Sequence, residues 1–308
     1  MQKIIFRLLA RLALLALIIL TANTVAAEPL KVVASFSILA DLTQRVGAER
    51  VEVHTLVGQN ADAHVYQPTP ADAKTIAQAR LVIVNGFGFE GWIDRLVKSS
   101  GFRGKVLTAS SGVKTLKRPY FRSDAQNAHK HDNEIDPHAW QDLANALRYV
   151  DNIAQALGDA DPAGRVVYQA NAAKYKQEIS ALDDELRKSF NAIARERRKV
   201  VTAHDAFGYF SRAYGIDFIS PVGVNTDAEP SAADVGRIIQ QIRRERIPAV
   251  FMESISDTRL LERIRQESGA RIGGTLYSDS LSKADGPAPT YLDMMRHNAR
   301  TLAAALAN

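Results

Sequence analysis

Two groups of short β-branched segments, each alternating with longer helical patterns, lie on either side of one long helical stretch. The first group of predicted strands is 30–36, 51–57, 81–85 and 105–108. The second group is 199–203, 216–220, 248–253 and 272–277. Strands that alternate with helices are typical of parallel sheets built from right-handed βαβ units. The sequence therefore predicts an α/β protein with two lobes, each containing a parallel sheet.

The stretch between the two groups begins after Asp161-Pro162, a pair typical of a helix start, and continues to about Arg197 without a breaker. Roughly 33 helical residues would extend about 50 Å, because each residue adds about 1.5 Å. That is longer than one lobe needs, so we expect a rigid helix that runs along both lobes. The predicted domains are 28–160 for the first lobe, 161–197 for the connecting helix and 198–308 for the second lobe.

The first 27 residues have the parts of a secretory signal peptide. Lys3, Arg7 and Arg11 give a positive start, an unbroken apolar stretch follows at 12–20, and small residues at 25–27 suit a signal peptidase. The uncharged part is shorter than the roughly 20 residues of a membrane-spanning helix, which disfavours an uncleaved anchor. The chain has no cysteine for a lipid anchor. We therefore predict cleavage after residue 27 and a protein free in the periplasm.

Composition narrows the chemistry of the mature chain. The absence of cysteine excludes disulfides, thiolate zinc sites, iron–sulfur clusters and cysteine nucleophiles. Removal of the signal peptide lowers the basic residues from 39 to 36 against 34 acidic residues, a net charge of about +2. A nearly neutral chain gives no case for a nucleic-acid partner. The sequence also lacks a GxSxG elbow, a Walker loop and an HExxH motif.

Four side chains lie where a predicted strand ends or a predicted helix begins: His64, His138, His204 and Asp279. The carboxyl ends of strands are where open α/β sheets bind ligands. Because each half of the chain contributes two of the four, a cleft between lobes could hold three imidazoles and one carboxylate. That set suits tetrahedral Zn²⁺. Each residue alone is equally explained as a capping or loop residue, and their wide spacing is no metal motif in itself.

The polar segment 119–133 has no periodicity and contains His129 and His131. We expect it to form an exposed loop of the first lobe. One interpretation is an auxiliary site, where neutral imidazoles collect metal near the mouth of the cleft. A solvated loop with no metal role is the alternative, and the residue types favour it slightly.

At these same residues the sequence resembles the metal-binding solute-binding proteins of ABC importers, the zinc and manganese group. The resemblance covers essentially the whole mature chain. It rests on five segments in order: 64–72, 136–140 with Asn145, 202–207, 229–231, and 276–282 with Asp285-Gly286. It implies two (β/α) lobes joined by a rigid helix, with one divalent metal in the cleft. It also implies a ligand set of His64, His138, His204 and Asp279.

Family members with histidine at the third ligand position tend to favour zinc, whereas manganese binders usually carry glutamate there. His204 therefore points to zinc, with Mn²⁺ as the alternative. We expect a monomer that captures Zn²⁺ and delivers it to an ABC transporter permease in the inner membrane, with a metal chaperone as a further candidate partner. Ligating imidazoles must be neutral, so we expect affinity to fall below a pH of about 6.5. One departure from the family is Ala63, where proline often precedes the first ligand.

The rival function from a different class is a secreted zinc-dependent hydrolase. Catalytic zinc typically has three protein ligands and an open position for water. Asp279 as a fourth ligand would close the shell, so we expect no enzyme. The carboxylates of Asp205, Glu229 and Glu253 are candidates to orient a ligand imidazole, although a structural role is favoured for each. A role as a surface adhesin, sometimes ascribed to relatives, has neither support nor contrary indication in the sequence.

Overall fold

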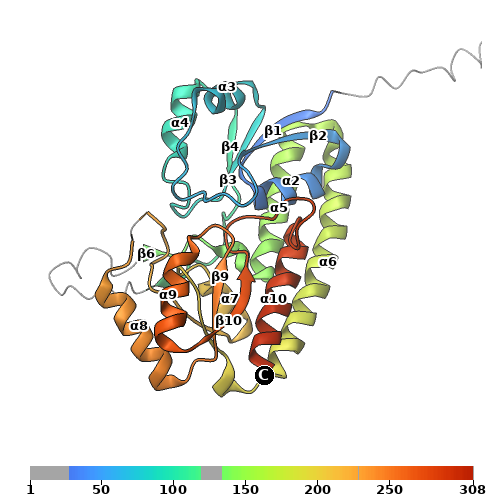
Figure 1. The fold of residues 1–308 in the computed structure, drawn as a ribbon. Coiled ribbons are helices and arrows are strands. Elements are labelled where there is room, and N and C mark those ends of the chain that lie inside the picture. Colours follow the sequence, from blue (N-terminus) through green and yellow to red (C-terminus); the bar gives the residue numbers. More distant parts are fainter. Residues whose placement is uncertain (1–27, 119–133, 228, 308) are drawn as a thin grey trace, which may run out of the picture.

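The computed structural model describes residues 28–118, 134–227 and 229–307 (Figure 1). The predicted signal peptide, 1–27, lies outside the described residues. So does the loop that carries His129 and His131. Among the described residues, no helix has both the length and the apolar character needed to cross a bilayer.

The first lobe is built on a parallel four-stranded sheet with the order β2-β1-β3-β4. The strands are β1 (Leu30–Phe36), β2 (Val51–Val57), β3 (Leu81–Val84) and β4 (Lys105–Thr108). The helices are α2 (Ser37–Gly47), α3 (Pro70–Gln78), α4 (Ile93–Ser100) and α5 (Leu143–Ala160). All four residues of β3 are buried, as expected for a central parallel strand that is covered by helices on both faces.

The second lobe repeats this topology. Its strands are β7 (Lys199–Val201), β8 (Asp217–Ile219), β9 (Ala249–Glu253) and β10 (Arg271–Leu276). They form a parallel sheet with the order β10-β9-β7-β8. In both sheets the first strand of the lobe therefore lies between the second and the third. The helices are α7 (Gly208–Tyr214), α8 (Ala232–Glu245), α9 (Thr258–Ser268) and α10 (Tyr291–Ala307).

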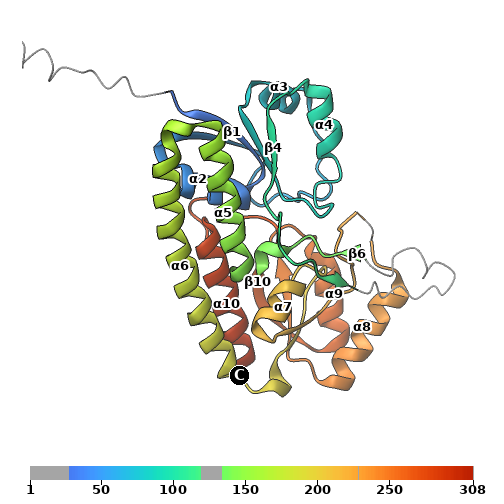
Figure 2. The ribbon, with the colours of Figure 1, turned by 180° about the vertical axis from the view of Figure 1, so that it is seen from behind.

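The long helix α6 (Arg165–Asn191) runs along both lobes, beside α5 above and α10 below (Figure 2). This confirms the predicted rigid connector. Its 27 residues are fewer than expected, because 3-10 turns at Pro162–Gly164 and Arg195–Arg197 replace α-helix at its two ends. One stripe of the helix is buried at steps of three and four: Tyr168, Ala172, Tyr175, Ile179, Leu182, Leu186 and Phe190. The stripe belongs to a core that extends from the first lobe through α6 and α10 to α7 and the strands of the second sheet.

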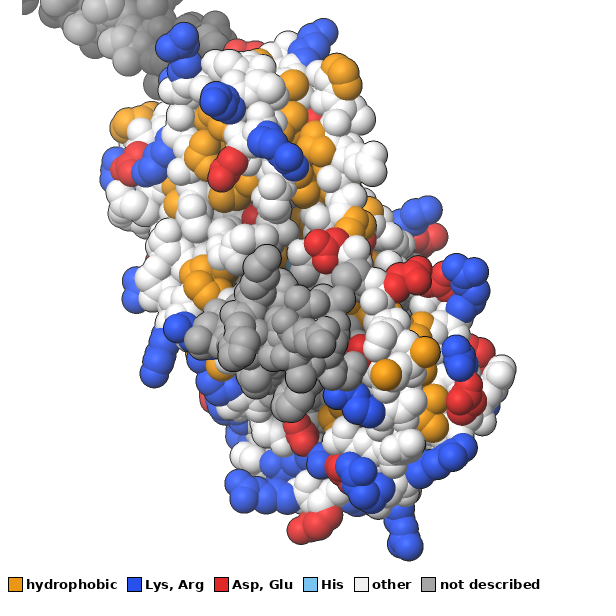
Figure 3. Space-filling view, turned by 90° about the vertical axis from the view of Figure 1, so that its left-hand side faces the viewer, with side chains coloured by type: hydrophobic (Ala, Val, Ile, Leu, Met, Phe, Trp, Pro, Cys, Tyr) orange, Lys and Arg blue, Asp and Glu red, His pale blue; other side chains and the backbone are white. Residues whose placement is uncertain are grey.

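Two short antiparallel strands that the sequence did not predict, β5 (Lys117–Arg118) and β6 (Glu134–Ile135), lead into the segment around His138. On the face shown in Figure 3, the Lys and Arg side chains of the second lobe are interspersed with Asp and Glu. In this lobe, Arg263 pairs with Glu267 and Arg265 with Glu262 on α9. The mixed charges agree with a nearly neutral chain.

Ile179 tests whether α6 contributes to the shared core or only links the lobes. Its side chain is fully buried, so Ile179→Ala should lower the free energy of unfolding by about 2–4 kcal/mol through lost burial and a cavity. Asp184→Ala, on the exposed side of the same helix, should change it by less than about 0.5 kcal/mol. Urea unfolding of the metal-free chain measures both variants. Equal effects of the two variants would contradict the assignment of the buried stripe.

Candidate metal centre

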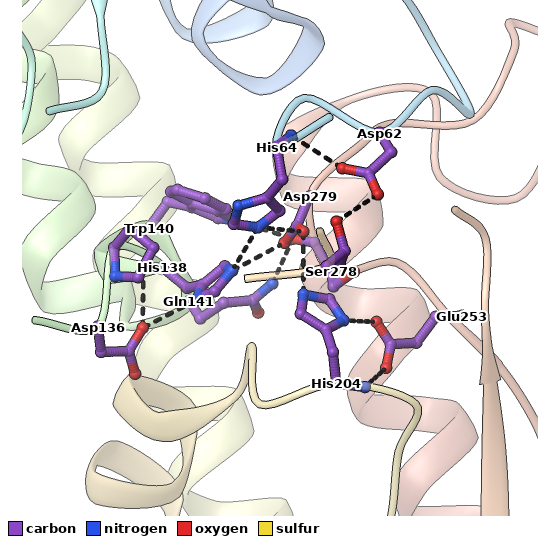
Figure 4. Close-up of polar contacts among 12 residues, drawn as sticks. Asp62, His64, Asp136, His138, Trp140, Gln141, His204, Glu253, Ser278 and Asp279 are labelled. Atoms are coloured by element: carbon purple, nitrogen blue, oxygen red, sulfur yellow. Dashed lines mark hydrogen bonds and ion pairs between the residues drawn. The ribbon is translucent and has the colours of Figure 1, made fainter. Parts of the chain in front are cut away.

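The four side chains selected from the sequence converge on one point between the lobes (Figure 4). One donor atom from each of His64, His138, His204 and Asp279 lies within 4.8 Å of all the others. The Nε2 atoms of His64 and His204 lie 3.3 and 3.1 Å from Oδ2 of Asp279. The Nε2 atom of His138 lies 3.3 Å from that of His64 and 3.5 Å from Oδ1 of Asp279.

These separations fit a small metal ion. Ligand atoms at about 2.0–2.1 Å from a tetrahedral ion are about 3.3–3.4 Å apart, close to the distances just given. The four side chains are 0–2 % exposed, so the donors are shielded from water. Both oxygens of Asp279 face histidine nitrogens, and the carboxylate can therefore offer one or two donor atoms.

Several buried polar atoms lack a hydrogen bond, some of them on the four candidate ligands. Among the described residues, these atoms are Asp136 Oδ2, Gln141 Oε1, the Tyr175 hydroxyl, His204 Nδ1, Glu253 Oε2, Ser254 Oγ, Ser278 Oγ and Asp279 Oδ1. His204 Nδ1 and Glu253 Oε2 form an ion-pair contact with each other. Asp279 Oδ1 is itself a candidate donor, and a buried oxygen without a hydrogen bond is costly, so this atom supports a polar ligand such as a cation.

His64 lies in the loop that follows β2, and two contacts fix its backbone. Its N–H donates to Oδ1 of Asp62 over 2.8 Å, and the indole N–H of Trp92 donates to the carbonyl of Ala63 over 2.7 Å. The ring of Phe89 meets the imidazole edge-on, with 4.6 Å between the ring centroids. Ala63 is fully buried. The loop is therefore firmly held without the proline that often precedes this histidine in the family.

His138 is oriented by Asp136, whose role the sequence analysis missed. Oδ1 of Asp136 accepts from the His138 N–H over 2.9 Å and contacts its Nδ1 over 2.8 Å. A carboxylate on Nδ1 leaves Nε2 available for a metal. The predicted placement of His138 at the start of a helix is only partly right. It precedes a single 3-10 turn, Ala139–Gln141, and α5 begins later with Asp142 as its cap.

His204 lies three residues beyond the end of β7, which stops at Val201, earlier than the predicted strand, and it is held by Glu253, the last residue of β9. Oε1 of Glu253 accepts from the N–H groups of Ala203 and His204 over 2.7 and 3.0 Å. Oε2 lies 2.6 Å from Nδ1 of His204, an ion-pair contact without hydrogen-bond geometry. The structural role favoured for Glu253 from the sequence is therefore incomplete, because the carboxylate also contacts a candidate ligand.

Asp279 follows β10 of the second lobe, yet its loop is bonded to the first. The carbonyl of Ser278 accepts from the indole N–H of Trp140 and the amide of Gln141 over 2.9 and 2.6 Å. On the other side, the N–H of Leu281 donates to Ser37 Oγ over 2.9 Å. These contacts fix the position of the carboxylate relative to the two histidines of the first lobe.

Electrostatics couple the four side chains. Burial opposes ionisation of Asp279, but His138 and His204 outweigh it and hold the pKa of the carboxyl well below its ordinary value. Burial alone would lower the pKa of His138, yet Asp279 and Asp136 raise it to about 9. Glu253 and Asp279 likewise raise the pKa of His204 well above its ordinary value. Burial dominates at His64 and lowers its pKa.

Two α/β lobes joined by a long helix, with a buried cage of nitrogen and oxygen donors between them, define a metal-binding solute-binding protein. The model of the ZnuA family, described as zinc-uptake complex component A periplasmic, matches residues 32–305. The chain belongs to this family, whose members serve ABC importers.

Similar proteins have been named for different metals. The manganese ABC transporter substrate-binding lipoprotein PsaA of Streptococcus pneumoniae is 32% identical over 295 residues, covering 93% of this chain and 92% of the relative. The manganese-binding lipoprotein MntA of Halalkalibacterium halodurans is 33% identical, covering 91% and 89%. The periplasmic zinc-binding protein TroA of Treponema pallidum has a similar structure, with a TM-score of 0.83, 29% identity and coverage of 91% and 100%. Relatives therefore establish a metal-binding importer component without singling out zinc.

The localisation predicted from the sequence is contradicted by these relatives. We expected a protein free in the periplasm, without a lipid anchor. PsaA and MntA are both named lipoproteins, a class of protein held at the membrane surface by lipid. The prediction rested on the absence of cysteine from this chain, and a missing anchor residue does not by itself establish where a protein resides.

The raised histidine pKa values predict proton release on metal binding. With the pKa of His138 raised to about 9 and that of His204 raised well above its ordinary value, both imidazoles are expected to carry protons at pH 7 in the metal-free protein, so about two protons should leave per divalent ion. The apparent affinity should therefore continue to rise above neutral pH, at least towards the pKa of about 9 of His138, instead of levelling off above the pKa of an ordinary imidazole. Calorimetric titration in two buffers of different ionisation enthalpy measures the released protons. Release of none would contradict this charge balance.

Proposed function

We propose that the protein captures Zn²⁺ with His64, His138, His204 and Asp279 and delivers it to an ABC transporter permease. The observation that carries the proposal is the buried cage of three Nε2 atoms and one carboxylate, in which four separations of 3.1–3.5 Å are close to those around a tetrahedral ion. Three imidazoles suit zinc, which also outcompetes Mn²⁺ at most nitrogen-containing sites. His204 at the third position agrees with the zinc-binding members that the sequence resembles.

Manganese is the second candidate cargo, and one feature of the cage favours it. Both oxygens of Asp279 face the centre, so a bidentate carboxylate would raise the number of donor atoms to five. Manganese prefers oxygen donors and accepts more than four ligands. Two similar proteins, PsaA and MntA, are named for manganese. The choice between the metals rests on measured affinities.

The proposed role is binding rather than catalysis. The carboxylate of Asp279 is fully buried and occupies the position that a catalytic zinc keeps open for water. A secreted hydrolase would use three ligands and a nearby base. We propose that the chain acts as a monomer that presents the cage to the permease, with a metal chaperone as a further partner to be tested.

We propose that the chain is divided into a leader, two lobes and a connector. Residues 1–27 act as a removable leader, 28–160 and 198–308 form the two lobes, and 161–197 form the connector. The core that α6 shares with both lobes supports the role of the connector as a rigid framework. In this arrangement each lobe contributes two of the four donors of the cage.

A competition titration distinguishes the two metals. The demetallated chain without residues 1–27 is titrated with Zn²⁺ in the presence of excess Mn²⁺, and with each ion alone. We expect one tight equivalent of zinc that manganese does not displace. Displacement of bound zinc by manganese would identify manganese as the cargo. Tight binding of neither ion would overturn the proposed function.

Asp279→Ala distinguishes a carrier from a hydrolase. Loss of the only anionic donor from a buried cage should lower zinc affinity by at least about 100-fold, because binding then lacks both a ligand and its charge. His54→Ala is the matched control, since His54 is exposed on β2. It should leave the affinity unchanged. A variant at Asp279 that kept its metal and lost a hydrolytic activity of the wild type would contradict the carrier role.

A further inference from the structure

Glu253 lies at the point where two strands of the second sheet separate. The register between β7 and β9 pairs Val201 with Val250. Beyond Val201 the chain pairs with the residues that come after β8, as the parallel bridge between His204 and Val222 shows. Glu253, at the end of β9, closes the resulting gap by accepting from two consecutive N–H groups, those of Ala203 and His204. Such a divergence of strands is where open α/β sheets place ligands.

The same carboxylate also contacts the imidazole of His204. While one oxygen holds the backbone, the other lies 2.6 Å from Nδ1, and the opposite ring atom, Nε2, lies 3.1 Å from Asp279 (Figure 4). Glu253 is 3% exposed, so water competes little for its oxygens. The ring of His204 is therefore fixed from both sides.

We propose that Glu253 is a positioning and specificity-determining residue, which fixes His204 with its proton on Nδ1 and thereby favours zinc over manganese. This inference rests on the proposed function of the cage as a metal site. A carboxylate that lies against the far nitrogen of a ligating imidazole favours a proton on that nitrogen and strengthens the near nitrogen as a donor. A stronger nitrogen donor benefits zinc more than manganese, which prefers oxygen.

The first lobe contains a carboxylate in a comparable place that serves as a control. Glu90 is buried and accepts from the N–H groups of Asn85 and Gly86 over 2.6 and 3.3 Å, just after β3. It also accepts from the hydroxyl of Ser35, on β1, over 2.5 Å. Like Glu253, it links the ends of the first and third strands of its lobe. Its oxygens accept from backbone N–H groups and a serine hydroxyl, whereas Glu253 also contacts a candidate ligand.

The test measures zinc and manganese affinities of four proteins by competition with a chromophoric chelator: wild type, Glu253→Gln, His204→Ala and the double variant. We expect Glu253→Gln to weaken zinc binding by about 10–100-fold and manganese binding by a smaller factor. In the His204→Ala background, Glu253→Gln should have no further effect, because Glu253 acts through His204. Equal effects in both backgrounds, or an unchanged zinc-to-manganese ratio, would overturn the inference.

A purely structural role predicts a different pattern. Glu90→Gln and Glu253→Gln would then both lower the unfolding temperature of the metal-free protein and leave the ratio of the two affinities unchanged. If the wild type binds neither metal, the proposed function is wrong. If the wild type binds zinc and Glu253→Gln binds both metals with the same affinities as the wild type, only the inference about Glu253 is wrong.

A measurement on the wild type keeps the inference testable if Glu253→Gln does not fold. Long-range ¹H–¹⁵N NMR of the zinc-loaded protein reports the tautomer of each histidine, with His204 assigned by its absence from His204→Ala. We expect a proton on Nδ1 of His204 and the metal on Nε2. Metal on Nδ1, or an Nδ1 without a proton, would overturn the inference.

Discussion

The buried carboxylate of Asp279 is the constraint on which the centre depends. A charge removed from water is costly unless it is paired, and Asp279 is fully buried with three imidazoles around it. Two further carboxylates, Asp136 and Glu253, lie against Nδ1 of His138 and His204. Three carboxylates therefore lie against the three histidines, and a divalent cation that displaced two protons would leave the net charge of this buried group unchanged.

The two lobes contribute unequally to this centre. Their sheets share one topology, and each has a buried glutamate that links the ends of its first and third strands. Yet the loop of Asp279 is bonded to Trp140, Gln141 and Ser37 of the first lobe. Three of the four donors are thus held by the first lobe, and His204 is held by the second sheet. Repetition of the fold supplied two similar sheet edges, and loop contacts made the centre asymmetric.

The sequence predicted the features that depend on local pattern. Alternation of strands and helices gave both sheets, and placement at strand ends selected the four side chains that the structure brings together. The orientation of side chains, the exact ends of helices and the contacts between distant residues were not predictable. Asp136 looked like part of a helix start, whereas its carboxylate faces His138 two residues later. The length of α6 was overestimated because 3-10 turns beyond its two ends continue the helical spacing. The role of Glu253 could not be recognised without the register between β7 and β9, which the sequence pattern does not show.

Burial limits how an ion can enter or leave this centre. The donor side chains are almost inaccessible to water, and hydrogen bonds cross from one lobe to the other on two sides of them. One joins Thr226 to Asp62 over 2.7 Å, two residues before His64. Others join Ser278 to the segment around Trp140 and Leu281 to Ser37. Separation of the two lobes would break these contacts, so the bonds between the lobes, in addition to the ligands, should influence the rate at which the ion exchanges.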